Sequence, residues 1–276
     1  MNARLSSLSE LEIPQQDVRL VVASSDLNVS KYITTVIMVF MRNGSSVVIW
    51  RKFKKCSINA NVPPEEYDRQ LYNLLSEHGM ELKNLGIRID AWAIDGNGTA
   101  WNAVTRFANN SKTICGISAA SFVGRASHQY RDYLRSRLKE SVNRTLLCGD
   151  DDEQKKFGSG TRWTYFDSDL YHEKCQKGFL QSVGNLGSIS WYKGADHSKF
   201  SIQVCAEKLV DKVQRADGTV EYKWKQIGTD HDVLDAIGQA LAVYGSFGFS
   251  DNTIGKTSTI QRKGIKRFPR KKYVFT

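Results

Sequence analysis

The chain has 276 residues, of which 39 are Lys or Arg and 29 are Asp or Glu, for a net charge of +10. This charge favours a polyanionic partner, either nucleic acid or an acidic membrane surface, and the 41% hydrophobic fraction is that of an ordinary globular protein. No apolar run is long enough to span a bilayer and the N-terminus lacks a signal-peptide core, so we expect a protein that is not secreted. Five scattered cysteines without a C-x-x-C pair argue against zinc and a disulfide framework.

The first part of the chain predicts three strands joined by short connections. After a polar lead-in over residues 1–16, apolar β-rich runs occur at 18–23, 32–41 and 46–53, with a turn signal at 42–45. A helix begins near Pro64, because prolines followed by acidic residues are typical of a helix start. Residues 87–94 predict a fourth strand, Thr99 begins a second helix, and residues 113–117 predict a short fifth strand.

The pattern changes beyond this core. Residues 125–144 are basic with helical spacing, 149–160 predict a polar loop, and 163–166 predict a strand. Asp169 is a candidate cap for the next helix, and the amphipathic residues 199–212 predict another. A hairpin is expected at 215–224 and a helix over 230–244. We therefore expect one domain over residues 17–248 and a basic tail over 249–276.

Four aspartates suggest a metal site. Asp95 ends the fourth strand, where a carboxylate is costly to bury unless it is paired, and Asp26 ends the first. Asp232 and Asp235 are three residues apart, so both project from one face of the late helix. Such a cluster binds two Mg²⁺ or Mn²⁺ ions and suits phosphodiester hydrolysis. Taken singly, each acid also fits a turn or helix-start role.

The order of the elements predicts the fold. Three strands, a helix, a strand, a helix, a strand and a late helix are the order of an RNase H-like domain, an α/β fold with a mixed five-stranded sheet flanked by helices. In that fold the first and fourth strands are neighbours, which brings Asp26 close to Asp95. Asp90 has the opposite pleat parity and is expected to face away. His172 receives no functional role, because it lacks the spacing of a metal ligand. His231 lies beside a helix start and is expected to be structural, with a contact to a phosphate or a metal as the alternative.

Four stretches, at residues 21–26, 93–98, 200–209 and 232–236, resemble the nuclease domain of phage large terminase subunits of the lambda-type family. The resemblance covers about residues 15–248. It implies catalytic acids at Asp26, Asp95 and the last motif, where relatives carry an acid that matches Asp232 or Asp235. It also implies an endonuclease that cuts concatemeric double-stranded DNA in the host cytoplasm, with the portal protein, the small terminase subunit and a separate ATPase domain as partners.

One expected feature of full large terminases does not match. Those proteins carry an ATPase, but the nearest P-loop pattern here, at residues 248–257, has Ser250 where a glycine is required. We therefore expect no nucleotide site in this chain, and either an isolated nuclease domain or a nuclease whose motor lies on another chain.

Two basic clusters are candidates for binding the DNA backbone, with a solvated helix face and a disordered tail as the alternatives. The first comprises Arg125, Arg131, Arg135 and Lys139, and the second comprises Arg262, Lys263, Lys266 and Arg267. Two other functions remain open at this point. One is a RuvC-like Holliday-junction resolvase, and the other is a non-catalytic DNA- or portal-binding module on an RNase H scaffold.

Overall fold

The computed structural model describes residues 5–14, 17–28, 30–56, 58, 61–127, 129–130, 163–216 and 220–247. Across these residues a seven-stranded sheet has the order β6-β5-β4-β1-β2-β3-β7, and two further strands form a separate hairpin. The strands are β1 (Val18–Asn28), β2 (Tyr32–Met41), β3 (Ser46–Lys55), β4 (Ala91–Asp95), β5 (Ala119–Arg125), β6 (Trp163–Asp167), β7 (Ile189–Trp191), β8 (Glu207–Gln214) and β9 (Val220–Gln226). Strands β1 to β3 are antiparallel neighbours, whereas β4, β5 and β6 run parallel to β1.

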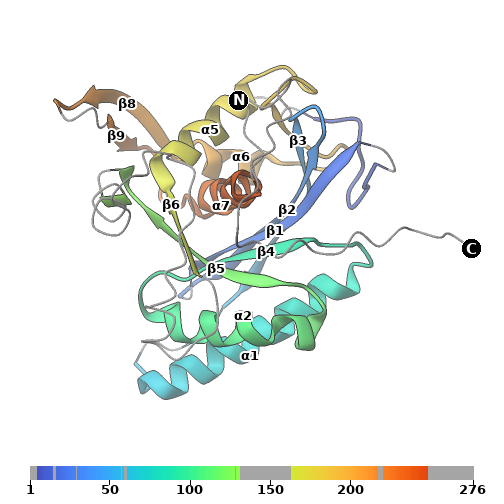
Figure 1. Cartoon of the computed structure of the whole chain (residues 1–276), viewed down its shortest axis with the longest axis vertical. Helices are drawn as coiled ribbons and strands as arrows, with labels where there is room; N and C mark the ends of the chain where they lie inside the picture. The colour runs from blue at the N-terminus through green and yellow to red at the C-terminus, as the bar shows by residue number, and fades with distance from the viewer. Residues whose placement is uncertain are drawn as a thin grey trace, which may run out of the picture.

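Helices cover both faces of the main sheet. They are α1 (Pro64–Asn84), the short 3-10 helix η1 (Gly98–Ala100), α2 (Trp101–Cys115), α5 (Ser168–Leu180), α6 (Ser198–Val204) and α7 (Asp232–Ser246). Figure 1 shows α1 and α2 on one side of the sheet and α5, α6 and α7 on the other. None of these described helices has both the length and the apolar character needed to cross a membrane.

The alternation of side chains along the central strands divides the core in two. In β1, Leu20 and Val22 belong to the cluster under α7, whereas Val21 and Ala23 belong to the cluster over α1 and α2. A strand covered on both faces reads as a continuous apolar run, which is why the strands were visible in the sequence. Because Asp26 has the parity of Val22, its side chain lies on the α7 face.

A close approach of α5 to α7 depends on two glycines. A Cβ atom on Gly238 would lie 3.3 Å from Cδ2 of His172, and one on Gly245 would lie 2.6 Å from the hydroxyl oxygen of Tyr171. Helix α7 also packs on β1 and β2 and is buried along nearly its whole length. The glycines therefore allow α5 to bring His172 against the helix that carries Asp235.

Below the acids, a buried chain of hydrogen bonds joins three strands to α1. Nε1 of Trp92 donates to Oγ of Ser25 at 2.9 Å, and Ser25 bonds to the Thr35 hydroxyl at 2.8 Å. Oγ1 of Thr35 lies 2.7 Å from Nε2 of His78. Because every member is buried, this chain satisfies groups that would otherwise be costly in the core. It fixes β1, β2 and β4 relative to one another next to Asp26.

The sequence correctly predicted the first four strands, the first helices and the late helix, but the fifth strand was wrong. Helix α2 continues to Cys115 and ends at Gly116, whose φ of 77° is left-handed, so residues 113–115 are helical and β5 follows at Ala119. A sheet of five strands was also wrong, because β6 and β7 extend it to seven.

Two further expectations were wrong in the second half of the chain. Residues 199–212 are not one helix, because α6 ends at Val204 and β8 begins at Glu207. The cap of α5 is Asp167, whose side chain accepts from the backbone N–H of Leu170, and Asp169 lies in the first turn. The helical stretch expected over 125–144 starts later than expected, because Arg125 ends strand β5 and the helical residues described there are Ser127, Gln129 and Tyr130; residues 131–144 lie outside the described part of the chain. The expected polar loop, the turn of the hairpin at 217–219 and the basic tail lie outside the described residues.

The described part of the N-terminal lead-in contacts the sheet. Leu5 forms a parallel bridge with Trp191, and the backbone N–H of Ser6 donates to the Trp191 carbonyl at 2.7 Å. The N–H of Leu11 donates to the Ile49 carbonyl at 2.9 Å. These bonds hold the lead-in against the strands at the β3–β7 side of the sheet.

Candidate active site

Asp26 and Asp95 lie on neighbouring parallel strands. Register pairs Ser25 of β1 with Ile94 of β4, so the next residues stand side by side: Asp95 is the last residue of β4, and Asp26 lies two residues before the end of β1. Asp95 shares the pleat parity of Ala93, which packs in the cluster under α7, so both carboxylates lie on the α7 face. The adjacency of these two acids agrees with the expected order of the sheet.

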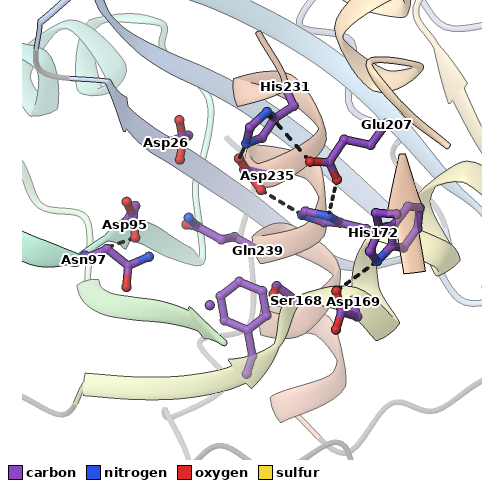
Figure 2. Close-up of a pocket in the computed structure, with 13 residues that line it drawn as sticks. Asp26, Asp95, Asn97, Ser168, Asp169, His172, Glu207, His231, Asp235 and Gln239 are labelled. Carbon is purple, nitrogen blue, oxygen red and sulfur yellow. Dashed lines mark hydrogen bonds and ion pairs between the residues drawn. The ribbon is translucent and has the colours of Figure 1, made fainter. Parts of the chain in front are cut away.

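Asp235 supplies a third carboxylate from the first turn of α7, one turn before Gln239. Figure 2 shows Asp26 and Asp95 to the left of Asp235, with the side chain of Gln239 below Asp235 and extending toward Asp95. The cavity has a volume of about 370 Å³ and is lined by Asp26, Asp95, Asn97, Gly124, Phe166, Ser168, Asp169, His172, Glu207, Trp224, His231, Asp235 and Gln239. Three of the four predicted acids therefore meet in one pocket.

Asp232, the fourth predicted acid, is not among the residues that line the pocket. It is buried at the start of α7, where the hydroxyl of Thr34 donates to its Oδ2 at 3.5 Å. Burial, followed by the charges of Asp230 and Asp235, raises its pKa above the usual range. Its charge also acts on Asp26. In this arrangement Asp235 lines the pocket together with Asp26 and Asp95, whereas Asp232 lies outside the lining and contacts Thr34 of β2.

The carboxylates of the pocket repel one another. Burial, together with the charges of Asp235, Asp95 and Asp232, raises the pKa of Asp26 well above its ordinary value. Burial raises the pKa of Asp95 to about 7, although the backbone N–H of Asn97 donates to it and opposes the rise. Like charges that share one pocket remain ionised together more readily when a cation compensates them.

The oxygen-only donor set suits a hard divalent cation such as Mg²⁺ or Mn²⁺. Among the described residues, no three His, Cys, Asp or Glu side chains already converge into a metal cage. The fit therefore depends on the oxygen donors of Asp26, Asp95 and Asp235 and on the burial and mutual repulsion that raise the pKa values of Asp26 and Asp95, and not on preformed coordination.

Two histidines contact Asp235, and a glutamate contacts both histidines; the sequence assigned no site role to any of the three. Nε2 of His172 lies 2.7 Å from Oδ1 of Asp235, and its Nδ1 lies 3.5 Å from Oε2 of Glu207. Nε2 of His231 lies 3.3 Å from Oδ2 of Asp235. Burial alone would lower the pKa of His172, but the hydrogen bonds with Asp235 and Glu207 raise it to about 10. His172 is therefore an imidazolium ion between two carboxylates.

Asp169 joins three elements at the rim of the pocket. Its Oδ1 accepts from Nε1 of Trp224 in β9 at 2.9 Å, and its Oδ2 accepts from the backbone N–H of Ser127 at 2.7 Å. On the same hairpin, Lys212 forms an ion pair with Glu173 of α5. These bonds attach the β8–β9 hairpin to α5 and place Trp224 in the wall of the pocket.

Of the expected DNA-binding residues, only Arg125 lies in the described part of the chain. Its guanidinium donates to Oδ1 of Asn97 at 3.0 Å, so it stands at the rim close to Asp95. The other predicted DNA-binding residues lie outside the described ranges: Arg131, Arg135, Lys139, Arg262, Lys263, Lys266 and Arg267. Asp90 accepts from the backbone N–H of Val21 at 3.0 Å and pairs with Arg88, away from the pocket.

Comparison with solved structures finds distant similarities, among them the following two. The Thermus thermophilus RuvC structure has 12% identity and a TM-score of 0.36, over 83% of this chain and 97% of that chain. The Aquifex aeolicus Ppx/GppA phosphatase, type II variant, has 14% identity and a TM-score of 0.28, over 58% of this chain and 64% of that chain. Both scores are under 0.5, so neither similarity carries a statement about function.

Comparison with curated protein sequences gives no match. Comparison with protein families does. The model of the terminase large subunit gpA endonuclease domain matches residues 1–254, which is most of the chain and includes every acid of the pocket. The order of the sheet is the RNase H-like arrangement expected from the sequence. By this match over residues 1–254, the chain belongs to the family of the terminase large subunit gpA endonuclease domain and is a nuclease with an RNase H-like fold.

Proposed function

We propose that this nuclease is a divalent-metal-dependent endonuclease that cuts concatemeric double-stranded DNA during viral genome packaging. The observation that carries the proposal is the meeting of Asp26, Asp95 and Asp235, from β1, β4 and α7, around one pocket in a chain of this family. These three carboxylates would hold two Mg²⁺ or Mn²⁺ ions. When bound, such ions activate a water for attack on the phosphodiester and stabilise the leaving oxygen.

The protein's own groups would orient the acids. Asp26 and Asp95 are carried by central strands that are tied by the hydrogen bonds beneath them, so their positions are rigid. Asp235 is carried by α7, and the ion pair with His172 fixes its orientation. Glu207 completes that pair from β8 and adds a carboxylate at the opposite wall. Asp232 would act as a further acid whose charge strengthens the attraction for cations.

The protein would hold the DNA by its phosphate backbone. Such contacts position a duplex without reading its sequence, so the nuclease domain would supply little sequence specificity of its own. Arg125 at the rim is one candidate for such a contact. The portal protein, the small terminase subunit and an ATPase domain would present the DNA to the site. The proposed cleavage would take place in the cytoplasm of the host cell.

Cleavage of supercoiled plasmid tests the metal proposal. The wild type should nick and linearise plasmid with Mg²⁺ or Mn²⁺ and leave it intact in EDTA. Asp26→Asn, Asp95→Asn and Asp235→Asn should each lose at least about a hundredfold in rate, because each removes a charge that the ions require. Asp68→Asn on α1, which lies on the other side of the sheet, is the matched control and should cut normally. Cutting in EDTA, or full activity of Asp95→Asn, refutes the metal-dependent mechanism.

Two comparisons separate the remaining alternatives. A smaller loss for Asp232→Asn than for Asp235→Asn supports Asp235 as the ligand, and the reverse order assigns the role to Asp232. A junction resolvase would cut a four-way junction in preference to linear duplex of the same sequence. A binding module would shift DNA in a gel and leave it uncut in every metal.

A further inference from the structure

The edge of the sheet that carries the acids continues onto β2 and β3. Asp26 pairs across strands with Thr34, and Thr34 pairs with Phe53. Thr34 donates to Asp232 at the start of α7, so this row of side chains lies on the same face as the pocket. Because neighbouring strands are about 4.8 Å apart, β3 lies roughly 10 Å from the strand that carries Asp26.

The next row on this face is aromatic and positively charged. Tyr32 is opposite Lys55 in the register of β2 and β3; the residue is 40% exposed, and its ring centroid lies 5.7 Å from that of Phe53. Lys199 of α6 places its Nζ 5.0 Å from the centroid of Phe53. Tyr32, Lys55 and Lys199 are all exposed, and we call them the lysine rim.

The two lysines of the rim differ from their neighbours in having no carboxylate partner within the described residues. Lys31, by contrast, has its Nζ 2.9 Å from Asp230, and Lys54 on the opposite face is paired with Glu81. Two uncompensated cations beside an exposed aromatic ring are the surface chemistry that binds a nucleic-acid backbone.

Positive charge therefore flanks the acids on both sides along one edge. Arg125 stands beyond Asp95 at the end of β5, and the lysine rim stands beyond Asp26 at the ends of β2 and β3. The separation of roughly 10 Å between β1 and β3 spans about three phosphates of one DNA strand, because these phosphates are about 3.4 Å apart along the helix axis. A DNA strand that crosses the edge at right angles to the β-strands would meet both.

We propose that the lysine rim is a phosphate-binding subsite for DNA on one side of the cut. The proposal rests on the proposed function, because it takes the pocket as the place of cleavage. Lys55 and Lys199 bind successive phosphates, and the ring of Tyr32 packs against the intervening sugar or base. The subsite fixes the direction in which the strand leaves the acids and reads no sequence.

Binding of a fluorescein-labelled duplex, measured by anisotropy in Ca²⁺ to prevent cutting, tests this subsite. Lys55→Gln and Lys199→Gln should each lower the slope of log affinity against log salt by about 0.9, which weakens binding about eightfold at 0.1 M salt. Tyr32→Ala should weaken binding severalfold with an unchanged salt slope, because it removes stacking and not charge. Lys83→Gln and Met80→Ala, an exposed lysine and a 39%-exposed apolar residue of α1, are the matched controls.

The expected result is that the three rim variants lose affinity, keep their kcat at saturating DNA and differ clearly from the two α1 controls. Rim variants that bind like Lys83→Gln and Met80→Ala overturn the proposal. The outcome is independent of the mechanism of cleavage: active Asp95→Asn would refute the metal proposal without changing the binding curves. Conversely, normal binding by Lys55→Gln would leave the loss of cleavage in Asp95→Asn intact.

Discussion

Replacing Asp95 with asparagine is expected to stabilise the metal-free protein while it abolishes cleavage. Burial raises the pKa of Asp95 from 3.8 to about 7. Between these values the folded chain keeps a proton that the unfolded chain has lost, so the contribution of Asp95 to stability falls as the pH rises from about 4 to about 7. At about 1.4 kcal/mol per pH unit, the ionised carboxylate costs up to about 4 kcal/mol at pH 8.

Urea unfolding in EDTA at pH 4.5 and pH 8 measures this cost. Asp95→Asn should differ from the wild type by no more than about 1 kcal/mol at pH 4.5 and be up to about 4 kcal/mol more stable at pH 8. Asp68→Asn controls for the general loss of a negative charge and should show the same small difference at both pH values. An Asp95→Asn protein that is destabilised equally at both pH values would refute the reasoning, because the carboxylate would then have a structural role.

The other predictions concern metal, His172 and Gly96. At a Mn²⁺ concentration one hundred times the dissociation constant, the wild type should gain about 2.7 kcal/mol in urea unfolding and Asp95→Asn clearly less; equal gains would place the ion elsewhere. His172→Leu leaves Asp235 and Glu207 without the cation between them, and should cost about 3 kcal/mol in EDTA and slow cleavage. Gly96→Ala should cost about 1–3 kcal/mol, because its Cβ would lie 1.9 Å from Oγ of Ser121, and Ser121→Ala should restore part of the loss.

The sequence predicted the strand-end acids because local patterns determine their position. Asp26 and Asp95 each follow a buried apolar run, and the order of the elements makes those runs neighbours. The same local reasoning failed at the fifth strand. Residues 113–117 combine β-branched and apolar side chains, which favour a strand. Helix α2 nevertheless extends through Cys115 and ends at the left-handed Gly116, so strand β5 begins only at Ala119.

The break between α6 and β8 also depends on the tertiary structure. Residues 199–212 have an amphipathic pattern that fits a helix, but the backbone N–H groups of Ile227 and Gly228 both donate to the carbonyl of Ala206. That pairing with the end of β9 starts a hairpin in the middle of the pattern. Glu207 therefore leaves a predicted helix face and becomes a wall of the pocket, which no feature of its own segment indicates.

His172 illustrates why the supporting residues of the site escape prediction when the acids do not. An acid at the end of a buried strand is unusual in its own segment, whereas a histidine on an amphipathic helix is not. The role of His172 depends on the glycine of α7 that admits its ring, on Asp235 one turn earlier in α7, and on Glu207 at the start of a hairpin. Since these groups come from three elements, their meeting follows from how the elements pack. The acids of such a pocket are therefore more readily located from the sequence than the residues that orient them.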